Sequence, residues 1–534
     1  MPLGMNRPTW SAFFVPEHRF SRLAWAVTAA VALAAGLAAC GTKSGLSVGE
    51  AADGGIDRDL DTGVVDSSVD TRPVDCLSDV DCDDGVFCNG TEHCVRNVCG
   101  PGLPVECVPP PDGCSVGRCV EGLRSCEFRP VDADEDGHLP DSCGGDDCND
   151  TNPTIFGGAP ELCDYEDNNC DGDVDEGLAY VGLGEPLPIS TGFFGAVHPD
   201  VVFNDTGYHA VFDDDLGGGQ VHHVSVSADG RRPSPATPVT FSSVLASSPD
   251  LTWTGTEMAL WHHYHLDEAF QGTVSLSALD ADGRVIRRSV AATPDVPDAD
   301  MPAAAFNGTE WGVVYVANLA SGLREVRYLQ ARQDGSVTVA PQVLASSVAI
   351  PHVKPAVTWA GSRFIVAWGE GRTVMIQGRD RTGRGVRWTR RQPAVADPQV
   401  TLAFADTSGD VAVAWTSVTR LDGVHYARYG EDGTARGTAI QITRDFAEHT
   451  GLSMSWSGRE LAVVYQATRT PVVGTFLVRF VPDLRWLSPP GAVDSLVGPN
   501  SGPAIAPSGR EYGVAYPADT PRTEAVRFRL AGCE

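Results

Sequence analysis

The chain has 534 residues, 15 of them cysteine, and its 70 acidic side chains outnumber 39 basic ones for a formal net charge of -31. This charge argues against nucleic acid and anionic membrane surfaces as partners. A content of 42% hydrophobic and 8% aromatic residues excludes a wholly disordered chain. Residues 41–180 hold 33 of the acidic residues, 7 basic ones and 13 of the cysteines, so the acid and the cysteines share one segment.

The N-terminus has the pattern of an export signal. Arg19 and Arg22 precede the apolar run Leu23–Ala39, and small residues come directly before Cys40. A basic start, an apolar stretch and small residues at the cut site are typical of a secretory signal peptide, here residues 1–39. One interpretation of Cys40 is an incidental cysteine at the start of an ordinary secreted protein.

The residues around Cys40 also resemble the lipobox of bacterial lipoproteins. The resemblance implies cleavage before Cys40, diacylation of that residue and a membrane partner reached through the lipid anchor. The residue after Cys40 is Gly41 and not an acidic residue. In a Gram-negative bacterium this implies sorting of the lipoprotein to the outer membrane, where it would face either the periplasm or the cell surface. In such an oxidising location disulfides persist.

Two segments follow the predicted lipidation site. Residues 40–75 are rich in Gly, Ser and Asp and lack a hydrophobic period, which predicts a flexible tether. Residues 76–129 contain nine cysteines with little aliphatic content between them, which predicts a disulfide framework. Nine is an odd number, so one of them must pair outside the group or stay free, and Cys143 is the nearest candidate and Cys533 a distant one.

Residues 130–178 form an acidic segment in which carboxylates and amides alternate before glycine. The first run begins at Asp132 and the second at Asp167, and such spacing lets one tight turn direct several oxygens at a hard cation. Calcium suits six to eight oxygen ligands in flexible geometry. The twelfth positions hold Cys143 and Leu178 instead of Glu, so neither run is an EF-hand, and a solvated acidic loop is the alternative. The candidate ligands are Asp132, Asp134, Asp136, Asp141, Asp147, Asp150, Asp167, Asn169, Asp171, Asp173 and Asp175.

The stretch from Asp146 to Gly177, with its Asp-Asp-Cys-Asn-Asp, Gly-Ala-Pro-Glu-Leu-Cys and Asp-Asn-Asn-Cys-Asp-Gly-Asp elements, resembles the MopE-type metal-binding motif of bacterial surface proteins. The resemblance spans Asp132–Gly177, and its name implies copper. Copper prefers thiolate, thioether or imidazole ligands, whereas this segment has no Met and only His138 as an imidazole. We therefore expect calcium, with copper as the less favoured ion.

Residues 179–534 contain seven repeats that begin 45 to 53 residues apart. In each repeat a second short apolar run ends in an aromatic residue, and four repeats have an Asp-Gly turn between alternating runs. Four short strands per repeat predict an all-β fold, a seven-bladed β-propeller. The last repeat has room for three strands only, so we expect residues 184–190 to supply the fourth. The second-run aromatics, expected to pack in the core, are Phe212, Trp261, Tyr315, Trp368, Trp415, Tyr465 and Tyr516.

The propeller has one cluster of residues able to do chemistry. We expect Asp213, Asp214 and Asp215 in a loop of the first blade and His262, His263 and His265 in the equivalent loop of the second. Carboxylates and imidazoles together bind transition metals or act as acid and base, although exposed polar loops are the commoner explanation. His222 and His223 lie in a predicted strand, which favours a structural role. HExxH, phosphate-loop and sialidase-repeat motifs are absent from the sequence.

Three functions are consistent with the sequence. The preferred hypothesis is a non-enzymatic surface lipoprotein whose calcium-stiffened, disulfide-bonded stalk displays the propeller for binding protein or glycan. A hydrolase or lyase acting on polysaccharide, with the Asp213–Asp215 and His262–His265 cluster at the propeller mouth, is the alternative. A copper-binding protein is the third.

Overall fold

The computed structural model describes residues 76–533 except 194, 215–218, 241–244, 266–271, 297, 418–422, 444–448, 470–471, 499–501, 510 and 521–522. The predicted signal peptide, Cys40 and the tether lie outside the described residues. Among those that are described, no helix has the length and hydropathy needed to cross a bilayer.

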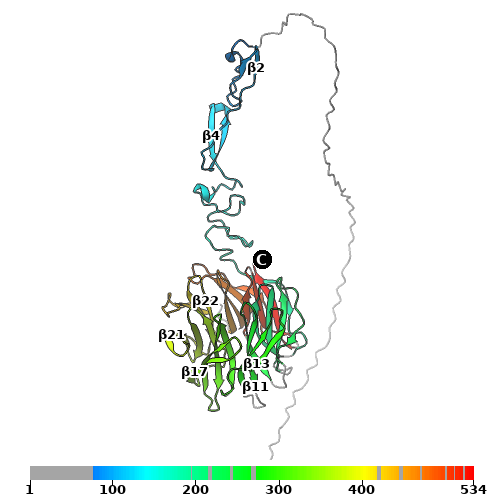
Figure 1. Cartoon of the computed structure of the whole chain (residues 1–534), viewed down its shortest axis with the longest axis vertical. Coiled ribbons are helices and arrows are strands. Elements are labelled where there is room, and N and C mark those ends of the chain that lie inside the picture. The colour runs from blue at the N-terminus through cyan, green and yellow to red at the C-terminus, as the bar shows by residue number, and fades with distance from the viewer. Residues whose placement is uncertain are drawn as a thin grey trace, which may run out of the picture. The chain divides into compact units, whose positions relative to one another are not determined.

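Residues 76–143, which span the cysteine-rich region and the start of the acidic segment, contain two β-hairpins and three short 3-10 helices. These elements are η1 (Asp79–Cys82), β1 (His93–Val95), β2 (Val98–Gly100), β3 (Ser115–Val120), η2 (Glu121–Leu123), β4 (Ser125–Pro130) and, in the acidic segment, η3 (Asp141–Cys143). Strand β1 pairs with β2, and β3 pairs with β4, both antiparallel (Figure 1). With so few apolar side chains available, disulfide bonds hold these hairpins in place of a packed core.

Seven disulfides use every cysteine from Cys76 onward. The pairs are Cys76–Cys94, Cys82–Cys99, Cys88–Cys119, Cys107–Cys126, Cys114–Cys143, Cys148–Cys170 and Cys163–Cys533. The odd member of the first nine cysteines is therefore Cys114, and its partner is Cys143, the nearest candidate. The distant candidate, Cys533, pairs with Cys163 instead.

The C-terminal region is the predicted seven-bladed β-propeller, and the all-β prediction is confirmed. Each blade is a four-stranded antiparallel sheet, and in the first six blades the strands are consecutive. Blades one to three comprise β6 (Ala196–Phe203), β7 (Gly207–Asp214), β8 (Val221–Ser227), β9 (Thr237–Pro238), β10 (Ala246–Trp253), β11 (Met258–His265), β12 (Gly272–Leu279), β13 (Val285–Ala291), β14 (Ala299–Phe306), β15 (Glu310–Asn318), β16 (Arg324–Arg332) and β17 (Val337–Ser347).

Blades four to six continue the same pattern around the ring. Their strands are β18 (Ala356–Trp359), β19 (Phe364–Glu370), β20 (Thr373–Arg379), β21 (Val386–Pro393), β22 (Pro398–Ala405), β23 (Asp410–Ser417), β24 (His425–Gly430), β25 (Ile440–Gln441), β26 (His449–Trp456), β27 (Leu461–Arg469), β28 (Val472–Phe480) and β29 (Gly491–Asp494). The Asp-Gly turns lie between third and fourth strands as expected, and Gly230, Gly283, Gly335 and Gly433 all adopt positive φ there.

The seventh blade closes the ring with a strand from the other end of the domain. It comprises β30 (Ala504–Pro507), β31 (Tyr512–Thr520) and β32 (Thr523–Gly532), and β5 (Val181–Pro188) pairs antiparallel with β32. The predicted closing segment, residues 184–190, therefore overlaps the strand that is used. In Figure 1 the red C-terminal strands lie beside the green strands of the first blade, and β30 and β31 both contact β6. Closure covers the edge that β32 would otherwise expose.

The core lies between adjacent blades. The seven second-strand aromatics are all at most 2% exposed, as expected for residues that pack one blade against the next. Trp261 packs edge-on against Trp311 of the following blade, with ring centroids 6.0 Å apart. Large aromatic rings at one repeated position fill the space between neighbouring twisted sheets and hold the strands of both in register.

Candidate functional site

The first acidic run folds into a compact turn whose carboxylates bind backbone amides. Oδ1 of Asp132 accepts a hydrogen bond from the amide of Glu135 at 2.8 Å, and its Oδ2 accepts one from Gly137 at 3.1 Å. Asp136 accepts from the amide of His138 at 2.7 Å. Gly137 has φ +97°, a conformation that glycine adopts without strain. The local sequence thus dictates the turn predicted for this run.

Asp147 and Asp150, downstream of this turn, lie close to its carboxylates. One oxygen each of Asp132, Asp134 and Asp136 lies within 4.8 Å of the others, and Asp134, Asp147 and Asp150 form a second such group. Because Asp134 belongs to both groups, five predicted ligands come together. The bridge between Pro140 and Asp147 brings the two segments side by side.

Several carboxylate oxygens at this cluster lack a partner. Asp147 is 1% exposed, and one buried oxygen each of Asp134, Asp136 and Asp147 has no hydrogen-bond donor among the described residues. Partial burial, together with the charges of Asp136 and Asp147, raises the pKa of Asp134. Burying an oxygen without a hydrogen-bond donor is energetically unfavourable. A cation among these oxygens would offset the repulsion between the carboxylates and would supply the contacts that they lack.

The donor set of the cluster, Asp132, Asp134, Asp136, Asp147 and Asp150, consists of oxygens alone. The nearby His138 is engaged elsewhere, with Nδ1 2.9 Å from Asp146 and its ring stacked on Phe156. The cysteines of this segment are in disulfides. Such a set fits a hard metal ion better than one that prefers sulfur or imidazole. Asp141, also predicted as a ligand, is exposed in η3 and belongs to neither group.

The second acidic run forms a similar turn. Oδ2 of Asp167 accepts from the amide of Gly172 at 2.8 Å, and Oδ1 of Asn169 accepts from Asp171 at 3.0 Å. Glu161, which was not among the predicted residues, binds the amides of Asn169 and Asp175 at 3.0 and 2.8 Å. The sequence signal for Glu161 was its position two residues before Cys163, within the Pro-Glu-Leu-Cys element of the motif.

Two glutamates, Glu161 and Glu176, supply carboxylates near this turn. Burial raises the pKa of Glu161 to about 7, and the charge of Glu176 adds to that effect. Glu176 accepts a hydrogen bond from Nδ2 of Asn169 at 2.5 Å, and its other oxygen is buried without a partner among the described residues. No group of three metal-binding side chains is found at residues 167–176 in the described chain, however.

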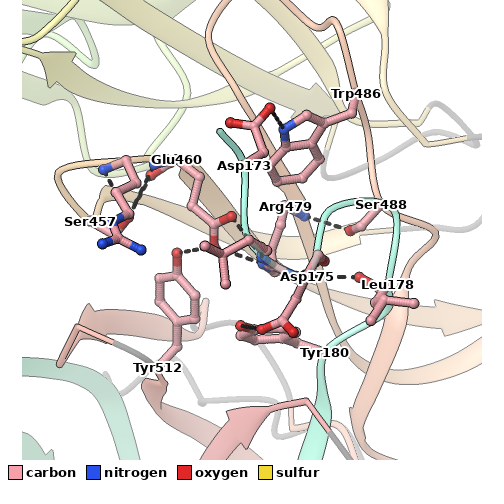
Figure 2. Close-up of polar contacts among 12 residues, drawn as sticks. Asp173, Asp175, Leu178, Tyr180, Ser457, Glu460, Arg479, Trp486, Ser488 and Tyr512 are labelled. Carbon is pink, nitrogen blue, oxygen red and sulfur yellow. Dashed lines mark hydrogen bonds and ion pairs between the residues drawn. The ribbon is translucent and has the colours of Figure 1, made fainter. Parts of the chain in front are cut away.

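Two predicted ligands of this run, Asp173 and Asp175, bind the propeller and its entry strand (Figure 2). Asp173 accepts a hydrogen bond from the indole of Trp486 at 2.9 Å and forms an ion pair with Arg485. Asp175 is fully buried, and its Oδ2 accepts from the hydroxyl of Tyr180 at 3.2 Å. Asp173 therefore joins the acidic run to blade six, and Asp175 joins it to the residue directly before β5 of blade seven.

Arg479 of β28 holds the end of the acidic run from the propeller side. Its side chain is 2% exposed, and its Nη1 donates to the backbone carbonyls of Asp175 and Leu178 at 3.2 and 3.4 Å. The guanidinium also lies 3.6 Å from the centroid of the Tyr180 ring. Figure 2 shows Arg479 lying among these groups. Backbone carbonyls, an aromatic face and a carboxylate together satisfy a buried guanidinium.

A covalent link reinforces this contact. Cys163 of the acidic segment is bonded to Cys533, directly after the last strand of the propeller, across a sequence separation of 370 residues. Tyr180 also belongs to the hydrophobic core that blades six and seven share. The acidic segment is therefore attached to the last two blades by one disulfide, one buried arginine and one buried tyrosine.

The propeller itself contains a cavity of about 800 Å³ lined by residues of all seven blades. Its walls are the first strand of each blade together with the residues just before it. In blades one to three that strand carries a β-bulge, with His198, Ser248 and Met301 at equivalent positions and at positive φ. Bulges re-aim side chains, and here they lie at the cavity wall. No single repeat contains this cavity, so repeat patterns in the sequence do not reveal it.

One buried charge cluster in the cavity wall connects three blades and the residues before β18. Asp200 accepts from the amide of Leu251 at 2.7 Å, and Asp250 accepts from Ala304 at 2.9 Å, so each carboxylate binds the next blade. Nζ of Lys354 lies 2.6 Å from Asp250. Burial raises the pKa of Asp200 to about 6, although the charge of Lys354 opposes this shift.

A second set of charged groups includes two of the predicted site residues. Asp300 lies 3.1 Å from both Nδ1 of His263 and Nε2 of His352. Burial alone would raise the pKa of Asp300, but hydrogen bonds from the two imidazoles lower it. Ser248 donates its amide to Asp213 at 2.9 Å and its hydroxyl to Asp300 at 3.3 Å. The structure thus connects Asp213 to His263 through Ser248 and Asp300, which line the cavity wall.

Comparison with known proteins supports the metal-binding interpretation of the acidic segment. Residues 147–176 match a family whose description is "Putative metal-binding motif", of the MopE type. This stretch has a metal-binding motif of known type. The match begins after Asp132, Asp134 and Asp136, which the structure nevertheless places with Asp147 and Asp150 of the motif. No curated protein sequence matches the chain.

Solved structures resemble the chain only distantly. A Dyadobacter fermentans protein of unknown function is 10% identical with a TM-score of 0.44, and the match covers 67% of this chain and all of that one. A Trypanosoma rangeli sialidase is 12% identical with a TM-score of 0.41, covering 57% of this chain and 60% of the sialidase. The six-bladed Aleuria aurantia lectin is 14% identical with a TM-score of 0.37, covering 60% and 98%. None of these similarities indicates a function.

The remaining predicted propeller residues that the structure describes lie in strands, so their predicted placement in loops is wrong. Asp214 ends β7 and pairs with His222 at 3.2 Å. His262 is fully buried in β11, with Nε2 3.1 Å from the hydroxyl of Ser277, and the rings of His263 and His265 are tilted against one another with centroids 4.2 Å apart. Asp215 lies outside the described residues. Successive side chains of a strand point to opposite faces of the sheet. The predicted cluster is therefore divided between the two faces.

Proposed function

We propose that this chain is an outer-membrane lipoprotein, anchored through Cys40, that presents its propeller to a protein or glycan ligand. The observation that carries the proposal is the attachment of the metal-binding motif to blades six and seven. Arg479 binds the carbonyls of Asp175 and Leu178, and Cys163 is bonded to Cys533. An ion in a motif attached in this way would stiffen the connection between the propeller and the preceding chain.

We further propose that the ion is calcium. The cluster around Asp134 offers carboxylate oxygens from five side chains, and nitrogen or sulfur donors are absent from both groups among the described residues. Calcium accepts six to eight oxygens in flexible geometry, whereas copper favours imidazole and sulfur. Copper stays the alternative that the family name suggests.

Calorimetric titration of the purified full-length protein with calcium, and separately with copper(II), tests this assignment. The Asp134→Asn/Asp147→Asn double variant should lose the calcium heat of this site. Asp141→Asn is the matched control because Asp141 is acidic, close in sequence and outside both groups, and it should bind as the wild type does. Tight copper binding with no response to calcium would overturn the proposal.

Anchoring has its own test. In a Gram-negative host, Cys40→Ser should move the protein from the membrane fraction to the soluble fraction and abolish incorporation of labelled palmitate. Unchanged fractionation would make the chain an ordinary secreted protein. The fractionation result does not depend on the metal. The lipid anchor and the calcium site are therefore tested independently of one another.

The cavity is the site where we propose that the ligand binds. Its polar wall groups, Asp250, Asp300, His352 and Lys354, match the many hydroxyls of a glycan or the polar groups of a protein segment. Binding to a panel of purified polysaccharides, measured for the wild type and for His352→Ala, tests this assignment. Asp432→Asn, in an exposed turn, is the control. Binding that survives His352→Ala would place the ligand elsewhere.

A hydrolase or lyase acting on polysaccharide is the second candidate, favoured by the raised pKa of Asp200 beside Asp250. A carboxylic acid whose pKa is raised toward neutral pH can serve as a general acid. New reducing ends, or the ultraviolet absorbance of an unsaturated product, would reveal this activity with the same panel. Loss of that activity in Asp200→Asn, with polysaccharide binding retained, would favour an enzyme over a binding protein.

A further inference from the structure

A second group of acidic side chains lies in the cysteine-rich region, far along the sequence from the metal-binding motif. Asp83 and Asp84 follow η1, and Glu92 immediately precedes β1. One carboxylate oxygen of each lies within 4.8 Å of the other two. The disulfides Cys82–Cys99 and Cys88–Cys119 hold the chain on both sides of these residues. Three carboxylates are therefore kept close together by covalent bonds.

Burial of Glu92 distinguishes this group from an ordinary exposed acidic turn. Glu92 is 8% exposed, and its Oε1 is buried with no hydrogen-bond donor in the described part of the chain. The buried Oδ1 of the neighbouring Asn89 also lacks a partner there. A buried carboxylate without a donor or a counter-charge is strongly unfavourable. Two unpaired acceptors beside two further carboxylates are the arrangement that a bound cation would satisfy.

Local hydrogen bonds orient the group. Asp83 accepts from the amide of Gly85 at 2.9 Å, and Asp84 accepts from the amide of Val86 at 2.8 Å. Nδ2 of Asn89 donates to Oδ2 of Asp84 at 2.8 Å, which ties the amide to the carboxylate group. Gly85 has φ +78°, so this tight turn suits glycine. The side chains are thus positioned by the backbone before any ion binds.

Basic side chains do not neutralise these carboxylates. Across the described residues, Asp83, Asp84 and Glu92 form no ion pair with Lys, Arg or His, and the nearest histidine in sequence, His93, lies 3.5 Å from Asp79. Sulfur ligands are also excluded, because all cysteines of the region are in disulfides. The available donors are oxygens alone.

We propose that Asp83, Asp84, Asn89 and Glu92 bind a calcium ion at a second site, distinct from the metal-binding motif. Three carboxylates and one amide oxygen make a hard, anionic donor set of the kind that calcium takes, with water completing the coordination. The ion would connect the turn after η1 to the start of β1, a region that has almost no hydrophobic core. This site extends the calcium chemistry proposed for the motif to a separate part of the chain.

Calcium titration of the full-length oxidised protein tests the site, with Glu92→Gln as the variant that removes one charge and keeps the shape. Glu92→Gln should lower the calcium stoichiometry by about one equivalent, or weaken that equivalent by at least about tenfold. Asp112→Asn, an exposed acidic residue of the same region, should bind as the wild type does. Titration of free thiols confirms that each variant retains its disulfides.

The Asp134→Asn/Asp147→Asn variant separates this inference from the proposed function. In that background the second site should still bind calcium, and adding Glu92→Gln should remove the remaining binding. If Glu92→Gln disturbs disulfide formation, Asp83→Asn replaces it, because Asp83 is exposed and lies outside the buried part of the group. Unchanged stoichiometry in both single variants, or no calcium binding once the motif is disabled, would overturn the second site.

Discussion

Arg479 forms a bidentate ion pair with Glu460, with its Nε 2.7 Å from Oε1 and its Nη2 2.8 Å from Oε2. The pair is buried, and Tyr512 of blade seven donates its hydroxyl to the same Oε1 at 2.7 Å. Because Glu460 fixes the guanidinium, the remaining donors point at carbonyls of the acidic segment. The ion pair inside blade six therefore orients the arginine that binds the end of the acidic segment.

Loss of this arginine should destabilise the protein far more than loss of its exposed neighbour. Arg479→Gln leaves Glu460 buried without its partner, and we expect a loss of about 3–5 kcal/mol in the free energy of unfolding. Arg485→Gln breaks an ion pair in which the arginine is 54% exposed, and this change should cost less than about 1 kcal/mol. Urea unfolding followed by tryptophan fluorescence measures both. Equal effects would contradict the role assigned to Arg479.

Removal of the long-range disulfide should also weaken the propeller. Cys163→Ser/Cys533→Ser opens a covalent loop of 370 residues, and we expect a loss of roughly 2–5 kcal/mol. Every tryptophan after residue 40 lies between Trp253 and Trp486, so fluorescence reports on the propeller. As a control, Cys82→Ser/Cys99→Ser opens a much shorter loop within the cysteine-rich region. A similar shift of the propeller transition in that control would argue against a specific effect of Cys163–Cys533.

The closing strand offers a test of ring closure. A Cβ at Gly182 would lie 2.2 Å from the carbonyl oxygen of Val493, so Gly182→Val should displace β5 from β32. We expect a loss of about 1–3 kcal/mol from overpacking, together with self-association through the exposed edge of β32. Size-exclusion chromatography and thermal unfolding measure these effects. Glu185→Ala, at an exposed position of the same strand, should stay monomeric if the wild type does.

Acid should destabilise the propeller through buried histidine. Burial lowers the pKa of His223 to about 3, and the neighbouring His209, whose Nδ1 lies 2.9 Å from Nε2 of His223, adds to this effect. Asp280 and Asp282, the acidic groups near this pair, oppose the shift. The folded state thus binds a proton more weakly than the unfolded state, whose histidine titrates near 6.5.

The sign of the effect follows from this difference. The stabilisation by neutral His223 is complete above pH 6.5 and is lost as the pH falls toward 3, at about 1.4 kcal/mol per pH unit. Urea unfolding at pH 7.5 and pH 5 should show this slope. His223→Gln, which retains a polar partner for His209, should reduce it. A slope that is identical in the variant would assign the acid sensitivity to other groups.

Local patterns in the sequence predicted most of the fold. Alternating apolar runs, Asp-Gly turns and one aromatic per repeat, such as Trp261 and Trp415, are properties of neighbouring residues, and strand and hairpin formation depends on the same short distances. The missing strand of the last repeat likewise identified its replacement near Gly184. The turns at Asp132 and Asp167 could be predicted for the same reason, because carboxylate and amide oxygens of their side chains accept hydrogen bonds from backbone amides two to five residues away.

Only the tertiary structure decided which distant residues meet. The pairing of Cys163 with Cys533, the contact of Arg479 with Asp175 and the approach of Asp213 to Ser248 each join segments whose separation no local pattern encodes. The charged cavity could not be predicted from the sequence, because each blade contributes only a few residues to it. Composition and spacing determined which residues could bind a metal ion, whereas the tertiary structure determined which carboxylates cluster and which bind the propeller instead.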